Sequence, residues 1–111
     1  MVDSIINNTL QSLGVPVARL YYRGDAETFI TFQLVLGART IFADDICEGE
    51  EYIYRADVYS RNDWIALVKK AVATLDVLEC YEITIDPESF ESDTGYFHVP
   101  ITFKIIEKTE V

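Results

Sequence analysis

The single histidine, His98, is the first residue to test for catalysis, because histidine is the side chain that most often exchanges protons near neutral pH. It lies between Phe97 and Val99, in a run whose alternating pattern predicts a β-strand. A general base needs a positioned acid or thiol beside it, and the sequence identifies neither. An isolated histidine is more often an ordinary strand residue or a subunit contact, and we interpret His98 in this way.

Acidic side chains gather in two segments that could bind a hard cation through carboxylate oxygens. The first segment contains Asp44, Asp45, Glu48, Glu50 and Glu51, and the second contains Glu88, Glu91 and Asp93. Their spacing does not follow the EF-hand pattern of alternating ligands, a central glycine and a terminal glutamate. Runs of charge are usually solvated, so acidic surface is favoured over a metal site in both segments.

The remaining reactive side chains are equally isolated. Ser60 and Ser89 lack the glycines of a nucleophile elbow, and the chain has no glycine-rich phosphate loop. Cys47 and Cys80 are far apart and have no Cys or His neighbour at metal-ligand spacing, which favours two free thiols. We therefore expect a protein that is not an enzyme and that has no cofactor and no metal. A metal-dependent enzyme built on the first acidic segment is the weaker alternative.

Composition and charge narrow the classes of partner. The chain has 111 residues, half of them hydrophobic, which predicts one domain over residues 1–111 with a sizeable core. Nineteen acidic residues outnumber nine basic ones and give a net charge of −10. Direct attraction to nucleic acid phosphates or to an anionic membrane is therefore not expected. No basic leader with an apolar core and no membrane-spanning run is present, which predicts synthesis in the cytoplasm.

Hydrophobic periodicity predicts the elements that must position these residues. The order is α-β-β-β-α-β-β, an α+β fold with one mostly antiparallel sheet of about five strands covered on one face by two amphipathic helices. The predicted elements are a helix over 3–13, a hairpin of 18–22 with 28–36, a long connection over 37–51, a strand over 51–60, a helix opened by a capping box at Ser60 and Asp63, a strand over 80–86, an acidic loop over 87–95 and a strand over 96–107. Pro100 indicates an edge or a bulge in the last strand.

Tyrosines and arginines on these strands are the candidates for binding another protein. Tyrosine is enriched where proteins meet, since it offers a rigid apolar face with a polar tip. The candidate interface residues outside the two acidic segments are Tyr22, Arg23, Arg39, Tyr52, Tyr54, Arg55 and His98.

Four segments give the chain a resemblance to the tail terminator, or tail completion, proteins of long-tailed phages and Gram-positive prophages. They are Gly14 to Phe32, with Tyr21-Tyr22-Arg23-Gly24 before Thr28-Phe29-Ile30-Thr31-Phe32; Ala43 to Ser60, with Tyr52-Ile53-Tyr54-Arg55; the amphipathic helix that follows; and Thr94 to Phe103, with Tyr96-Phe97-His98-Val99-Pro100. Each motif is weak alone, and their shared order carries the resemblance. Residues 76–80 lack the glycine-containing break that is usual in the family.

The resemblance implies an α+β subunit that forms a ring, often of six copies, on the head-proximal end of the tail tube. Its partners would be copies of itself, the major tail tube protein and the head connector or stopper protein. It would act in the host bacterial cytoplasm during assembly and then in the virion, at the head–tail junction. The sequence leaves open whether the free protein is a monomer. The charge pattern also allows a different class of protein, a small intracellular adaptor or inhibitor whose acidic segments mimic nucleic acid.

Overall fold

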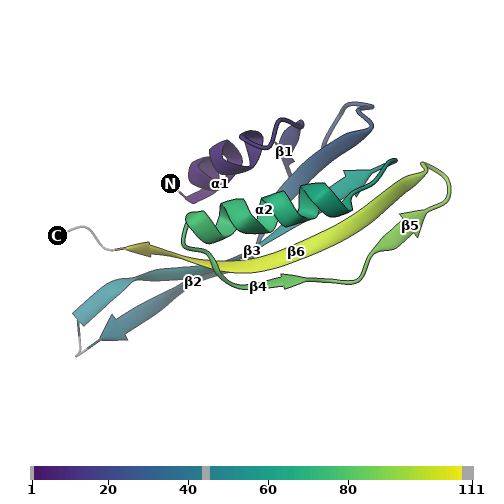
Figure 1. Ribbon diagram of the computed structural model, residues 1–111. Coiled ribbons are helices and arrows are strands. Elements are labelled where there is room, and N and C mark those ends of the chain that lie inside the picture. The colour runs from purple at the N-terminus through teal and green to yellow at the C-terminus, as the bar shows by residue number, and fades with distance from the viewer. Residues whose placement is uncertain (1, 44–45, 109–111) are drawn as a thin grey trace.

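The computed structural model describes residues 2–43 and 46–108, and the side chains of residues 2–36 and 49–107 (Figure 1). Two helices and six strands follow one another along these residues. They are α1 (Val2–Gln11), β1 (Val17–Arg19), β2 (Thr28–Ala43), β3 (Ile46–Ser60), α2 (Ile65–Val77), β4 (Tyr81–Ile85), β5 (Ser89–Glu91) and β6 (Tyr96–Lys108). Neither of these helices is long and apolar enough to cross a membrane.

The strands form one sheet in the order β1-β2-β3-β6-β4, with β5 also paired to β6. All strand pairs are antiparallel except β1 with β2, which is parallel. Figure 1 shows α1 and α2 on the same face of the sheet. This confirms the predicted α+β fold, with β5 as an additional short strand.

The core lies between that face and the two helices. Every second residue of the three longest strands contributes to it, because successive side chains of a strand point to opposite faces. The buried core residues are Val2, Ile6 and Leu10 of α1, Ile30 and Phe32 of β2, Tyr54, Ala56 and Val58 of β3, Val68, Ala71 and Leu75 of α2, Cys80, and Val99, Ile101, Phe103 and Ile105 of β6. Burying each large apolar side chain contributes about 1.5–3 kcal/mol.

The predicted hairpin of 18–22 with 28–36 is wrong. β1 runs parallel to β2, with Val17 opposite Ile30 and Arg19 opposite Phe32. Leu20 has a φ of 68° and Tyr21 N donates to Arg19 O, so the chain turns sharply out of the sheet after β1. The following loop then leads back to the start of β2, so that β2 runs in the same direction as β1. A hairpin turn would instead have made the two strands antiparallel.

The predicted connection over 37–51 is also wrong. β2 continues to Ala43 and β3 starts at Ile46, so the two strands form a long hairpin that projects beyond the helices (Figure 1). Register shifts interrupt their pairing between Leu34 and Leu36, between Leu36 and Arg39 and between Ile41 and Phe42. β6 joins this hairpin from Gly49 onward, where Glu50 lies opposite Glu107 and Glu51 opposite Ile106. Charged residues are compatible with this part of the sheet because an antiparallel sheet that projects beyond its helices can face water.

Three smaller predictions also need correction. The second helix begins at Ile65 and not at Ser60; the Ser60 hydroxyl accepts a hydrogen bond from Asn62 N, and Asp63 Oδ1 accepts one from Ile65 N. The segment 87–95 contains β5. Pro100 lies in an interior strand, and its carbonyl accepts the Asp86 N–H. Because the nitrogen and carbonyl of one strand residue face the same side, the missing N–H of Pro100 faces the break between β4 and β5.

α2 ends in a defined turn although residues 76–80 contain no glycine. Cys80 N donates to Leu75 O and Glu79 N donates to Asp76 O, the two hydrogen bonds of a Schellman motif. Glu79 occupies the position that glycine usually takes in this motif, and its φ is 70°. A side chain there is strained, since the left-handed conformation brings Cβ close to the following carbonyl oxygen.

We predict that Glu79→Gly stabilises the protein by about 1 kcal/mol, because glycine adopts this conformation without the steric cost. Urea unfolding followed by circular dichroism measures the change. The matched control, Asp76→Gly, lies three residues earlier in the helix and should lower the stability by up to about 1 kcal/mol. Equal effects of the two variants would contradict the assignment of strain to Glu79.

Cys80 is a free thiol in the core, as predicted, whereas the side chain of Cys47 lies outside the described residues. Burial, followed by the nearby charge of Asp76, raises the pKa of the Cys80 thiol from 9.0 to about 11. The folded state therefore holds this proton more tightly than the unfolded state does.

In a Cys47→Ser variant, we predict that the contribution of Cys80 to stability is complete below pH 9.0 and is lost as the pH rises through about 11. Iodoacetamide should accordingly modify Cys80 in folded protein far more slowly than in urea-unfolded protein, because the thiolate is the reactive form. Mass spectrometry after timed quenching measures both rates. Equal rates in the two states would contradict the burial of the thiol.

Candidate functional site

The face of the sheet opposite the helices carries a second group of ordered side chains. These side chains come from the alternate residues of β2, β3 and β6, which cannot reach the core. The register places Phe29, Tyr59 and His98 in one row across the three strands and Thr31, Asp57 and Pro100 in the next. We call this surface the helix-free face and consider it the candidate site.

Four rings stack across the helix-free face. The ring centroids are 4.4 Å apart for Tyr22 and Phe29, 4.7 Å for Phe29 and Tyr59, and 4.3 Å for Tyr59 and His98. Tyr22 comes from the loop after β1, and Gly24 leaves room for it, since a Cβ at Gly24 would overlap the Tyr22 ring. Each such pair contributes about 0.5–1.5 kcal/mol beyond the area it buries.

Tyr96 closes one side of the stack. Its ring meets Phe29 and Tyr59 edge to face, with centroids 5.2 Å and 6.2 Å away, and its hydroxyl donates to Ala26 O at 2.7 Å. The guanidinium of Arg61 lies over the Tyr96 ring, 4.3 Å from its centroid. These contacts fix the loop after β1 against the sheet.

A buried carboxylate lies beside the stack. Asp57 is 3 % exposed, and its Oδ2 accepts a hydrogen bond from Arg55 Nε at 3.1 Å. Its Oδ1 lies 2.6 Å from His98 Nε2. The desolvation of this charge is therefore offset by two partners. An aspartate that orients a histidine is part of many catalytic sites. The register of β5 with β6 places Ser89 opposite His98, and among the described residues no serine, threonine or cysteine side chain is hydrogen-bonded to the imidazole.

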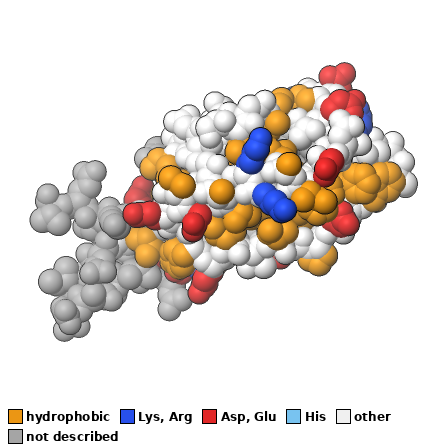
Figure 2. Space-filling view, viewed as in Figure 1, with side chains coloured by type: hydrophobic (Ala, Val, Ile, Leu, Met, Phe, Trp, Pro, Cys, Tyr) orange, Lys and Arg blue, Asp and Glu red, His pale blue; other side chains and the backbone are white. Residues whose placement is uncertain are grey.

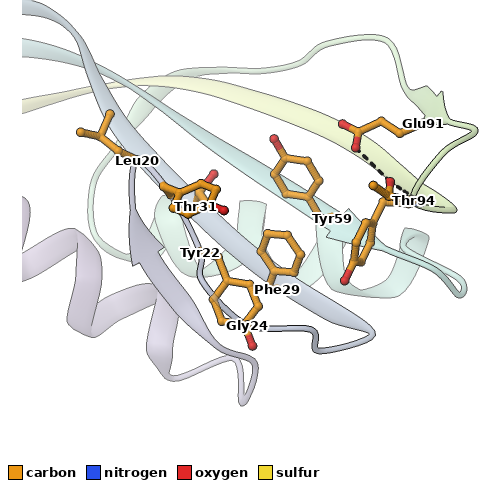
Figure 3. Close-up of a pocket in the computed structure, with 10 residues that line it drawn as sticks. Leu20, Tyr22, Gly24, Phe29, Thr31, Tyr59, Glu91 and Thr94 are labelled. Carbon is orange, nitrogen blue, oxygen red and sulfur yellow. Dashed lines mark hydrogen bonds between the residues drawn. The ribbon is translucent and has the colours of Figure 1, made fainter.

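A pocket of about 310 Å³ opens on the same face. Figure 3 shows the residues that line it: Leu20, Tyr21, Tyr22, Gly24, Phe29, Thr31, Tyr59, Glu91, Thr94 and Tyr96. Glu91 is the charged residue among them, and its Oε1 accepts a hydrogen bond from Thr94 at 3.1 Å. Burial, then the charges of Asp57 and Glu91, raise the pKa of Tyr59, so its hydroxyl stays protonated at neutral pH. Aromatic and apolar side chains form most of the lining, and the Glu91 carboxylate and the hydroxyls of Thr31 and Thr94 are its other polar groups besides the tyrosines.

The structure brings several of the predicted interface residues together. Tyr22, Arg55 and His98 lie on the helix-free face, and Glu91 lines its pocket. Arg23 lies at the rim, where its guanidinium is 5.8 Å from the Tyr21 ring centroid.

Other predicted residues lie elsewhere. Tyr54 is 2 % exposed and belongs to the core, where burial and a hydrogen bond from its hydroxyl to Asp3 raise its pKa. At the base of the hairpin, Tyr52 donates to Glu50 at 3.0 Å, which raises the pKa of Tyr52, and Tyr81 donates to Glu51. Glu88 and Asp93 are exposed on either side of β5. Arg39 and Glu48 lie in the hairpin, and their side chains are not among the described ones. Asp44 and Asp45 lie outside the described residues.

Sequence reasoning missed Phe29, Asp57, Tyr59 and Tyr96 as members of this site. A signal was present in β3, where Arg55, Asp57 and Tyr59 alternate on the face that does not enter the core. An acid between two polar or aromatic residues on one strand face indicates a local charge pair. No group of three or more His, Cys, Asp or Glu side chains in the described part of the chain is placed to hold a metal ion.

Comparison with known proteins finds similarity at the level of structure. No family model and no curated protein matches the sequence. The fold is shared with a virion chain. A chain from the virion of a native gene transfer agent particle superposes with a TM-score of 0.50 and 14% identity, over 90% of this chain and 84% of that one. A second solved structure, which carries no functional description, superposes with a TM-score of 0.60 and 11% identity, over 99% of this chain and 92% of that one. These likenesses establish a shared fold.

We predict that Asp57→Asn destabilises the protein by about 1–3 kcal/mol, because the partly exposed Arg55 and His98 lose the buried charge that they bind. Urea unfolding at pH 7 measures the loss. Asp93→Asn, an exposed substitution of the same kind, should change stability by no more than about 0.5 kcal/mol. If both variants unfold at the wild-type urea concentration, the buried charge pair is not a stabilising contact.

Proposed function

We propose that the chain is a structural protein of a virion, specifically a tail completion or terminator protein that caps the head-proximal end of a phage or prophage tail tube as a ring. The observation that carries the proposal is the fold shared, over 90% of the chain, with a chain of a gene transfer agent virion. The order of motifs that resembles the tail terminator family gives independent support.

The helix-free face favours a binding role. Its aromatic side chains are held in one arrangement by stacking and by the buried Asp57. These side chains therefore lose little conformational entropy when a partner binds. Its pocket is bordered by exposed Leu20 and Tyr21, the kind of apolar and aromatic surface found in protein interfaces. The proposed partners are other copies of the chain, the major tail tube protein and the head connector or stopper protein.

Charge supports the same assignment of partners. The side of the molecule in Figure 2 shows acidic side chains toward both ends and few basic ones. With a net charge of −10, a ring of such subunits would repel DNA phosphates that pass through it, and would not bind them. The protein would act in the bacterial cytoplasm during assembly and then at the head–tail junction of the virion.

We predict that deletion of the gene from its phage or prophage gives tail tubes of unregulated length that do not join heads, since nothing would stop tube growth. Electron microscopy of induced lysates measures the tail lengths. Complementation by the wild-type gene should restore uniform tails, and Lys69→Ala, an exposed change on the outer side of α2, should restore them equally. Tails of normal length attached to heads in the deletion strain would overturn the proposal. A strictly monomeric protein that copurifies with a nucleic-acid enzyme would instead favour the acidic mimic.

A further inference from the structure

The outer edge of β2 is paired over only a small part of its length. β1 covers residues Ile30 to Phe32, and the described strands offer no partner beyond them. Ile30 N donates to Pro16 O, and Phe32 O accepts from Leu20 N, so the backbone groups of these two residues point away from β3. The two-residue alternation of a strand directs the N–H and C=O of Leu34 to the same open side.

The side chains at this open edge are apolar and exposed. Leu34, Val35 and Leu36 are 38 %, 54 % and 59 % exposed, although successive residues point to opposite faces of the sheet. Leu20, which is bonded to Phe32, adds a further exposed apolar side chain beside them. Unpaired backbone next to exposed apolar side chains is the surface to which another strand adds.

The opposite edge of the sheet is also open. Only β6 pairs with β4 among the described strands, and Asp86 N donates toward β6 at Pro100 O. Alternation therefore directs the backbone groups of Ile85 outward, and the Ile85 side chain is 51 % exposed. Among the described strands, Leu34 of β2 and Ile85 of β4 thus each have an outward-facing backbone pair next to an exposed apolar side chain.

The charges of the two edges favour the meeting of unlike edges. Residues 33–43 of β2 contain Arg39 and no acidic residue. Residues 79–88, which include β4, contain Glu79, Glu82, Asp86 and Glu88 and no basic residue, although Lys104 of β6 pairs with Glu82. Two β4 edges would bring like charges opposite each other, whereas a β2 edge and a β4 edge are complementary.

We propose that the β2 edge around Leu34 pairs with the β4 edge around Ile85 of a second copy of this chain, which extends the sheet from one subunit to the next. Such a contact is heterologous, because different surfaces of the two copies meet, and its repetition generates a ring or a filament. The inference deepens the proposed function and rests on it for the closure into a ring.

The test uses two edge variants, Leu34→Pro and Ile85→Pro. Each removes an outward N–H and leaves the hydrogen bonds to β3 or β6 in place, so folding is preserved at these edge positions. Each variant alone should lose self-association by at least about tenfold in Kd, as sedimentation velocity at concentrations up to about 1 mM measures. An equimolar mixture should form a 1:1 dimer and nothing larger, because each variant keeps the edge that the other lacks. Leu34→Thr, which retains the N–H, should assemble like the wild type, and circular dichroism and urea unfolding confirm the fold of every variant.

Three results would overturn the inference. They are a wild-type protein that stays monomeric over the same concentrations, assembly that survives both proline variants, and a loss of assembly in one variant only, which would indicate like edges meeting. These outcomes are separable from the proposed function. If the protein assembles through another surface and the deletion strain has irregular tails, the edge contact is wrong and the proposed function stands. If the edges pair in solution and the deletion strain has normal tails, the proposed function is wrong and the edge contact stands.

Discussion

The register of β3 against its two neighbours is the constraint on which the rest of the structure depends. Val58 faces Ile30 and Val99 in the core, while the adjacent Tyr59 faces Phe29 and His98 on the helix-free face. A slip of β3 by one residue would turn Val58 toward water and Asp57 toward the core. The helices and the aromatic stack therefore fix the same alignment from opposite sides of the sheet.

The helix-free face shows how a sheet covered on one side only can keep a charge out of water. Asp57 is opposite Thr31 and Pro100 in the register and is shielded by the rings of the neighbouring row. Its partners Arg55 and His98 occupy both carboxylate oxygens, which stabilises an ordered polar surface. An ordered surface of this kind can bind a partner with little rearrangement of its side chains.

Local periodicity predicted much of the fold. The alternation in 51–60 and 96–107 identified the core residues of β3 and β6, and the spacing of Val68, Ala71 and Leu75 identified α2. The pairing of β1 was not predictable in this way, because a short extended run carries no information about the direction of its neighbour. The candidate site was predicted in part: Tyr22, Arg55 and His98 were named, but the buried Asp57 that joins two of them was not.

The sequence by itself determined the fold class, the two apolar strand faces and the acidic surface, because these follow from side-chain type and from the periods of helix and strand. Only the tertiary structure decided that residues 37–43 and 46–51 are strands, since each is stabilised by backbone pairing with the other and not by its own composition. The same holds for the stack of Tyr22, Phe29, Tyr59 and His98. These residues are distant in the chain, and the register of three strands is what brings their rings within contact.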